Sequence, residues 1–77
     1  MITVKLFGLL RLDTGLREIT LEAAHVRQLK QLLPQACGVS AERLRGCVLL
    51  VNGQPAKDRT PLKNGDIVSL LSPVAGG

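Results

Sequence analysis

The side chains best suited to chemistry in this 77-residue chain are two cysteines and one histidine. Cys37 and Cys47 lie outside any Cys-x-x-Cys pair, and a single histidine cannot complete a four-ligand zinc site with them. We therefore expect both cysteines to be small buried hydrophobic residues. His25 stands where a helix N-cap would fall, and we interpret it as a capping or surface residue. The sequence predicts no metal site and no nucleotide site in this chain.

A second chemical feature is the C-terminal segment 72–77, which reads Ser-Pro-Val-Ala-Gly-Gly. It is predicted to form a flexible tail without regular structure, and fully extended it would reach about 20 Å. The Gly76–Gly77 tip has no side chains, so it is thin enough to thread a narrow tunnel and present a carboxylate to another protein's active site. The alternative is a frayed end without function, and composition by itself favours this alternative.

Composition narrows the function classes. The chain is 45% hydrophobic with a formal net charge of +4, which excludes disorder. Its lysines and arginines are scattered singly, without aromatic residues between them, so no nucleic-acid partner is expected. The longest apolar run is Cys47–Val51, far short of the roughly 20 residues of a membrane span. No carboxylate pair, catalytic triad or phosphate loop is recognisable. We expect a cytoplasmic, non-enzymatic domain that contacts no membrane and binds no cofactor.

The elements that would carry the tail follow from hydrophobic periodicity. Alternation predicts strands over 2–7 and 17–22, joined as a hairpin through a turn at 13–15. In the first strand Phe7 points away from the apolar face. A helix follows, with a stop at Gly38. Its apolar stripe consists of Val26, Leu29, Leu32 and Leu33.

The second half of the chain is predicted to complete a sheet. Cys47–Val51 is expected to be a fully buried central strand, followed by a tight Asn52–Gly53 turn. Residues 60–63 indicate a short capped turn, and 67–71 indicate the last strand. The prediction is an α+β fold with a mixed sheet of four or five strands packed on one main helix. The expected boundaries are a domain at 1–71 and a tail at 72–77.

The C-terminal half, VNGQPAKDRTPLKNGDIVSLLSPVAGG, resembles the MoaD/ThiS family of ubiquitin-like sulfur carriers. The elements that carry the resemblance are Val51-Asn52-Gly53, Leu62, the Gly65-Asp66 turn, the apolar strand 67–71 and the terminal Pro73–Gly77. The N-terminal VKLFGLLR also looks like the first strand of that family. The resemblance covers nearly the whole chain and implies the β-grasp, or ubiquitin-like, fold.

The resemblance further implies a chemistry centred on Gly77. A ubiquitin-activating-type adenylyltransferase would use ATP to adenylate the Gly77 carboxylate, and a sulfur donor, a sulfurtransferase, would convert the adenylate to a thiocarboxylate. The sulfur would then be delivered to a precursor of molybdopterin or of the thiamine thiazole. The LFGLLR stretch and the PVAGG ending look more like the small subunit of molybdopterin synthase, which implies the large catalytic subunit of that enzyme as a second partner.

A set of residues is predicted to contact these partners. Phe7 and Leu71 are both expected to point outward on neighbouring strands and to form an apolar patch near the tail, which Pro55 could extend. Arg11 falls where the resemblance suggests a polar contact with the activating enzyme. Within the tail, Gly76 would thread the partner's tunnel. The tail residues expected at the interface are Pro73, Val74 and Ala75.

Three classes of function remain open on the sequence. The first is a sulfur carrier of the molybdopterin or thiamine branch. The second is a ubiquitin-like modifier that is conjugated to lysines through Gly77. The third is a basic binding module whose glycine tail has no role.

Overall fold

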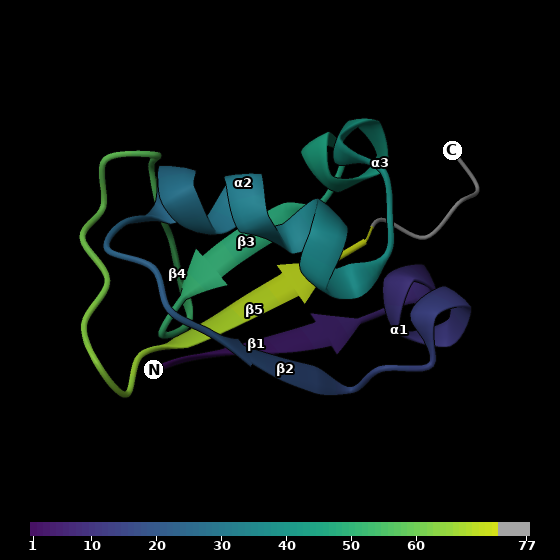
Figure 1. Cartoon of the computed structure of the whole chain (residues 1–77), viewed down its shortest axis with the longest axis horizontal. Coiled ribbons are helices and arrows are strands. Elements are labelled where there is room, and N and C mark those ends of the chain that lie inside the picture. The colour runs from purple at the N-terminus through teal and green to yellow at the C-terminus, as the bar shows by residue number, and fades with distance from the viewer. Residues whose placement is uncertain (73–77) are drawn as a thin grey trace.

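A computed structural model describes residues 1–72 and arranges them as a five-stranded sheet with helices (Figure 1). The predicted tail residues 73–77 lie outside the described part. The sheet order is β2-β1-β5-β3-β4, in which β1 and β5 are parallel and the other pairs antiparallel. This mixed sheet confirms the predicted α+β class. The elements are β1 (Ile2–Phe7), α1 (Leu9–Thr14), β2 (Glu18–Leu21), α2 (Val26–Cys37), α3 (Ala41–Arg45), β3 (Val48–Val51), β4 (Gln54–Pro55) and β5 (Ile67–Leu71).

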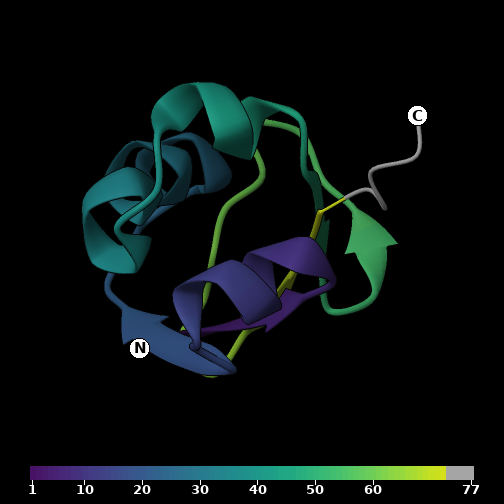
Figure 2. The same cartoon turned by 90° about the vertical axis from the view of Figure 1, so that its right-hand side faces the viewer.

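The core lies on one face of the sheet, because α2 and α3 both pack on the same side (Figure 2). We call this the inner face and the opposite one the outer face. The alternation predicted for β1 is confirmed, since every second residue of the strand is buried. The buried hydrophobic residues are Ile2, Val4, Leu6, Leu10, Val26, Leu29, Leu33, Cys37, Leu62, Val68 and Leu70.

α2 begins and ends at the residues that the sequence predicted, His25 and Gly38, and local hydrogen bonds fix its start. The His25 side chain accepts a hydrogen bond from Gln28 N, which confirms its capping role. The Gln28 side chain reaches back and accepts from Ala24 N at 2.7 Å, in the manner of a capping box. Gly38 ends the helix with φ of 72°, a left-handed conformation that glycine adopts without steric cost.

The connection between β1 and β2 differs from the predicted turn at 13–15. The two strands do pair antiparallel, but α1 lies between them. Leu10 is fully buried and fastens this short helix to the core, and Gly15 takes the left-handed conformation that closes it. Hydrophobic periodicity does not predict this helix, because six residues are too few to show the helical spacing of apolar side chains.

The prediction of a fully buried central strand at 47–51 is wrong. β5 occupies the centre of the sheet, and β3 lies between β5 and the two-residue β4. Leu49 pairs with buried Leu70 on the inner face, whereas Val48 is 55% exposed on the outer face. A continuous apolar run therefore does not mark a strand covered on both sides here, because no described helix covers the outer face.

Two smaller predictions also need correction. Leu32, which the sequence assigned to the apolar stripe of α2, is 38% exposed, and the stripe continues instead to Cys37. The expected capped turn at 60–63 does not form. The Thr60 hydroxyl accepts from Lys57 N and closes the preceding turn, while Pro61 pairs with His25 as an isolated β-bridge.

The Asn52–Gly53 turn forms as predicted and is tied to the start of β5. Both residues have positive φ, as a type I′ hairpin turn requires. The Asn52 side chain accepts from Ile67 N at 3.0 Å and donates to the Asp66 carboxylate at 3.1 Å. Asp66 also accepts from Lys63 N at 2.8 Å. One carboxylate thus joins the turn before β5 to the β3–β4 hairpin.

This carboxylate makes stability depend on pH. Hydrogen bonds from Lys63 N and the Asn52 amide lower the pKa of Asp66 below its ordinary 3.8. The unfolded state therefore binds more protons at acid pH, and the stabilisation present above about pH 4 is lost as the pH falls through the folded-state pKa. We expect Asp66→Asn to reduce the proton uptake on unfolding by a fraction of one proton, measured as a shallower fall of the free energy of unfolding below about pH 4.

Asp58 provides the comparison for this experiment, since a hydrogen bond and the charge of Lys30 also lower its pKa. In the double variant Asp58→Asn, Asp66→Asn the free energy of unfolding should fall less steeply below about pH 4 than in either single variant. If the free energy of unfolding falls as steeply below about pH 4 in the double variant as in the original chain, Asp58 and Asp66 are not the source of the pH dependence.

Candidate functional site

The outer face of the sheet carries an apolar cluster at the end of β5, which we call the outer-face patch. Phe7 lies opposite Leu71 in the parallel β1–β5 pair, as the sequence predicted. Val48 lies opposite Leu71 from the other side, so three strands contribute adjacent side chains. The members of the outer-face patch are Phe7, Val48, Leu50, Pro55 and Leu71.

These side chains are accessible to a partner. Phe7 is 38% and Val48 55% exposed, Pro55 is exposed, and Leu71 is half-buried. Pro55 pairs with Leu50, so it extends the patch on the β4 side as predicted. Polar residues adjoin it on the same face, among them Lys5 opposite Ser69. An apolar centre with a polar surround is the composition of a protein-docking surface.

Sequence reasoning missed two members of the patch, Val48 and Leu50. Their exposure follows once β3 is placed in a sheet that a helix layer covers on one side only. The sequence did indicate this exposure. It predicts only one long amphipathic helix, which can cover one face of the sheet and leaves the other face without a helix layer.

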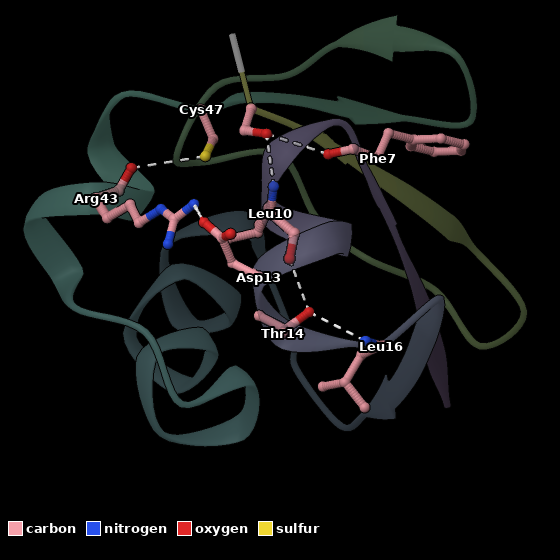
Figure 3. A network of polar contacts seen from close by, with 8 residues as sticks. Phe7, Leu10, Asp13, Thr14, Leu16, Arg43 and Cys47 are labelled. Atoms are coloured by element: carbon pink, nitrogen blue, oxygen red, sulfur yellow. Dashed lines mark hydrogen bonds and ion pairs between the residues drawn. The ribbon is translucent and has the colours of Figure 1, made fainter. Parts of the chain in front are cut away.

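The tail begins beside the patch. Ser72 follows Leu71 directly and is hydrogen bonded to the backbone of Phe7 and Leu10 (Figure 3). The sequence grouped Ser72 with the tail, and the structure gives it specific partners in the body of the domain. The remaining predicted tail residues, Pro73, Val74, Ala75, Gly76 and Gly77, lie outside the described residues, and their assignments stay predictions.

Arg11 is exposed on α1, the helix that begins where β1 ends. α1 and the end of β5 lie at the same end of the molecule, on the right in Figure 1. Asp13 of the same helix forms an ion pair with Arg43 of α3 (Figure 3). As a residue of α1, Arg11 therefore lies at the end of the domain where β5 ends.

The cysteines show no sign of activation. Cys37 is buried and Cys47 half-buried, so the prediction of burial is confirmed fully for the first only. Burial raises the pKa of both thiols, and for Cys47 the nearby Arg43 lowers it in part. Cys47 lines a cavity of about 240 Å³ between α2, α3 and the sheet, and its thiol lies 3.6 Å from the Arg43 carbonyl oxygen. Neither environment favours a thiolate.

Residues 1–72 contain no cluster of three or more His, Cys, Asp or Glu side chains that could hold a metal ion. None of the helices described is long and apolar enough to cross a membrane. Within this part of the chain, the outer-face patch at the root of the tail is therefore the feature best suited to function.

The fold and the patch define a ubiquitin-like β-grasp protein. The ThiS family matches residues 4–77, and the chain belongs to that family of ubiquitin-like sulfur carriers and modifiers. A search of curated proteins gives no match. The family and fold that the sequence predicted are thus confirmed.

Solved structures with the same fold come from several members of this group. One is a chain in the complex of subunits 1 and 2 of the molybdopterin-converting factor of Helicobacter pylori, with 29% identity, TM-score 0.71, and coverage of 99% of this chain and 97% of that one. SAMP1, the small archaeal modifier protein 1, of Haloferax volcanii has 26% identity, TM-score 0.81, and coverage of 99% and 98%. A chain of the BexX/CysO complex of Amycolatopsis orientalis has 25% identity, TM-score 0.73, and coverage of 100% of both chains.

Two of these structures are protein complexes. In each of them a small chain similar to this one is found together with another protein.

Proposed function

We propose that this chain is a sulfur carrier for molybdopterin synthesis and that its reactive group is the C-terminal carboxylate of Gly77. The observation that carries the proposal is the outer-face patch at the root of a Gly-Gly tail in a ThiS-family β-grasp domain. The similarity to a chain of the molybdopterin-converting factor of Helicobacter pylori supports this branch.

The chemistry divides between the chain and its partners. A ubiquitin-activating-type adenylyltransferase binds ATP, and the Gly77 carboxylate oxygen attacks the α-phosphorus and releases pyrophosphate. Sulfide-level sulfur from a sulfurtransferase then attacks the carbonyl carbon, and AMP leaves. The large subunit of molybdopterin synthase receives the resulting thiocarboxylate. The carrier contributes a docking surface and a tip without side chains, whereas the partner enzyme supplies ATP.

Intact mass spectrometry of the protein isolated from its own cells tests this proposal. A carrier should be found partly as a species about 16 Da heavier, because sulfur replaces one carboxylate oxygen. The same spectrum defines the C-terminal residue of the mature chain. A preparation without any thiocarboxylate, from cells that are making molybdopterin, would contradict the proposal. Loss of thiamine synthesis instead of molybdopterin synthesis on deletion of the gene would assign the chain to the thiamine branch.

A modifier is the second candidate, and the similarity to SAMP1 of Haloferax volcanii favours it. Both candidates share activation at Gly77, but a modifier ends as an amide on a lysine of another protein. Trypsin cleaves this chain last after Lys63, so peptides whose lysine carries residues 64–77 in amide linkage through Gly77 would support the modifier. Their absence beside an abundant thiocarboxylate would support the carrier.

The outer-face patch is expected to bind the activating enzyme. Leu71→Ser should weaken this binding about tenfold, because burying a hydroxyl in an apolar contact centre costs on the order of 1–2 kcal/mol. Phe7→Ala should have a similar effect through loss of the aromatic contact area. Binding is measured by isothermal titration calorimetry with the purified adenylyltransferase encoded in the same genome.

Ile67→Ser is the matched control for Leu71→Ser. Ile67 lies on the same face of β5 and is 40% exposed, but it is opposite Thr3 at the other end of the strand. Its substitution should leave the Kd unchanged. Equal weakening by both substitutions, or no weakening by Phe7→Ala and Leu71→Ser, would rule out the patch as the docking surface.

A further inference from the structure

Ser72 holds three parts of the chain together at the point where the described sheet ends. Its hydroxyl oxygen accepts a hydrogen bond from Leu10 N at 2.8 Å and donates one to the Phe7 carbonyl at 3.2 Å. Figure 3 shows the dashed lines that reach Phe7 and Leu10. One side chain therefore links the end of β1, the start of α1 and the end of β5. The hydroxyl uses both its donor and its acceptor capacity in doing so.

Gly8 makes this close approach possible. A Cβ atom at Gly8 would lie 2.8 Å from the Ser72 carbonyl oxygen and 2.9 Å from the Ser72 hydroxyl oxygen, below the 3.0 Å that real Cβ atoms essentially never cross. Gly8 also has φ of 70°, in the region that favours glycine. The chain thus turns from β1 into α1 in a space that only a residue without a side chain leaves open for Ser72.

We propose that Ser72 is a positioning residue, which fixes the position and direction of the backbone at residue 72, where residues 73–77 begin, relative to the outer-face patch. The proposal rests on the function proposed above. Phe7 connects the two features, because its side chain belongs to the patch and its carbonyl accepts the Ser72 hydrogen bond. An enzyme docked on the patch would therefore receive a tail of constant length, the five residues 73–77 that follow Ser72.

The expected effect follows from the length of unanchored chain. If the loss of both hydrogen bonds releases only residue 72, the segment beyond the last anchored residue grows from five to six residues, which lowers the effective concentration of Gly77 by only about a quarter. The loss of a fixed backbone direction at residue 72 should lower the rate further, since misplacing a reacting group by about 1 Å can cost up to about 10²-fold in rate. We expect Ser72→Ala to lower the kcat of adenylation about fivefold and to leave KM unchanged, because the patch remains intact.

The first experiment measures the anchor without any partner enzyme. Ser72→Ala removes the acceptor of Leu10 N, so amide hydrogen exchange at Leu10, followed by NMR, should become about tenfold faster. Ser40→Ala is the matched control, because the Ser40 hydroxyl accepts from Arg43 N at the start of a different helix, α3. It should accelerate exchange at Arg43 and leave Leu10 unchanged. Unaltered Leu10 exchange in Ser72→Ala would overturn the anchor.

The second experiment measures steady-state adenylation by the purified adenylyltransferase of the same genome. Ser72→Ala should show the fall in kcat at constant KM, Ser72→Thr should restore kcat because it keeps the hydroxyl, and Ser40→Ala should match the original chain in both constants. An unchanged kcat in Ser72→Ala, with the original chain active, would overturn the positioning role alone. An original chain that forms no adenylate would instead overturn the proposed function, and Leu10 exchange would still report on the anchor.

Discussion

Deletion of Gly77 is expected to abolish adenylation of the chain, with a loss of at least about 10³-fold in kcat/KM. The variant still ends in a carboxylate, but the chain is one residue shorter, so at full extension the carboxylate reaches about 3.3–3.6 Å less far. A displacement several times larger than the roughly 1 Å that costs 10²-fold leaves the reacting oxygen out of line with the α-phosphorus. The rate of ATP-dependent pyrophosphate release measures the effect.

Two comparisons make this deletion specific. Its melting temperature should equal that of the original chain, because the buried core extends only from Ile2 to Leu70. Its Kd for the adenylyltransferase should change little if the outer-face patch carries most of the binding. Full adenylation of the deletion variant would show that the reaction does not require Gly77. An original chain that is not adenylated either would exclude both the carrier and the modifier and would leave a binding module whose tail has no role.

The largest expected effect on stability comes from Leu29, which is fully buried where α2 faces the sheet. Leu29→Ala should lower the free energy of unfolding by about 2–5 kcal/mol through lost apolar burial and the cavity that remains. A domain of this length has only about 4–12 kcal/mol in total. The melting temperature should therefore fall by about 10–30 °C. Denaturant titration followed by circular dichroism measures the change.

Leu32→Ala provides a matched control on the same helix. The substitution and its effect on helix propensity are the same, but Leu32 is 38% exposed. It should lower the free energy of unfolding by less than about 1 kcal/mol. Equal losses at both positions would mean that the apolar stripe of α2 includes Leu32, as periodicity first indicated.

The sequence predicted most of the local structure correctly because short-range chemistry determines it. His25 caps α2 and Gly38 ends it, and the Asn52–Gly53 pair forms the tight turn, each through contacts within a few residues. The errors fall where local signals are weak. Six residues of α1 are too few to show a helical period. The apolar stripe predicted for α2 ends one turn too early, because the buried face continues to Cys37.

The candidate site was predictable in part. Alternation placed Phe7 and Leu71 on the outward face of their strands, and the structure pairs them directly. It could not reveal Val48, because an uninterrupted apolar run does not show which of its residues face the core. The roles of the tail residues from Pro73 to Gly77 remain predictions.

By itself, the sequence determined the element types at the caps, turns and alternating strands, the resemblance to a family, and the Gly-Gly ending. The tertiary structure decided which distant residues meet: parallel pairing of β1 with β5 brings Phe7 to Leu71, and the same pairing brings Ser72 to Leu10 across 62 positions of chain. The physical reason is that periodicity and capping depend on neighbours along the chain. Strand order and the open face of the sheet depend instead on how one helix layer buries the apolar surface of all five strands together.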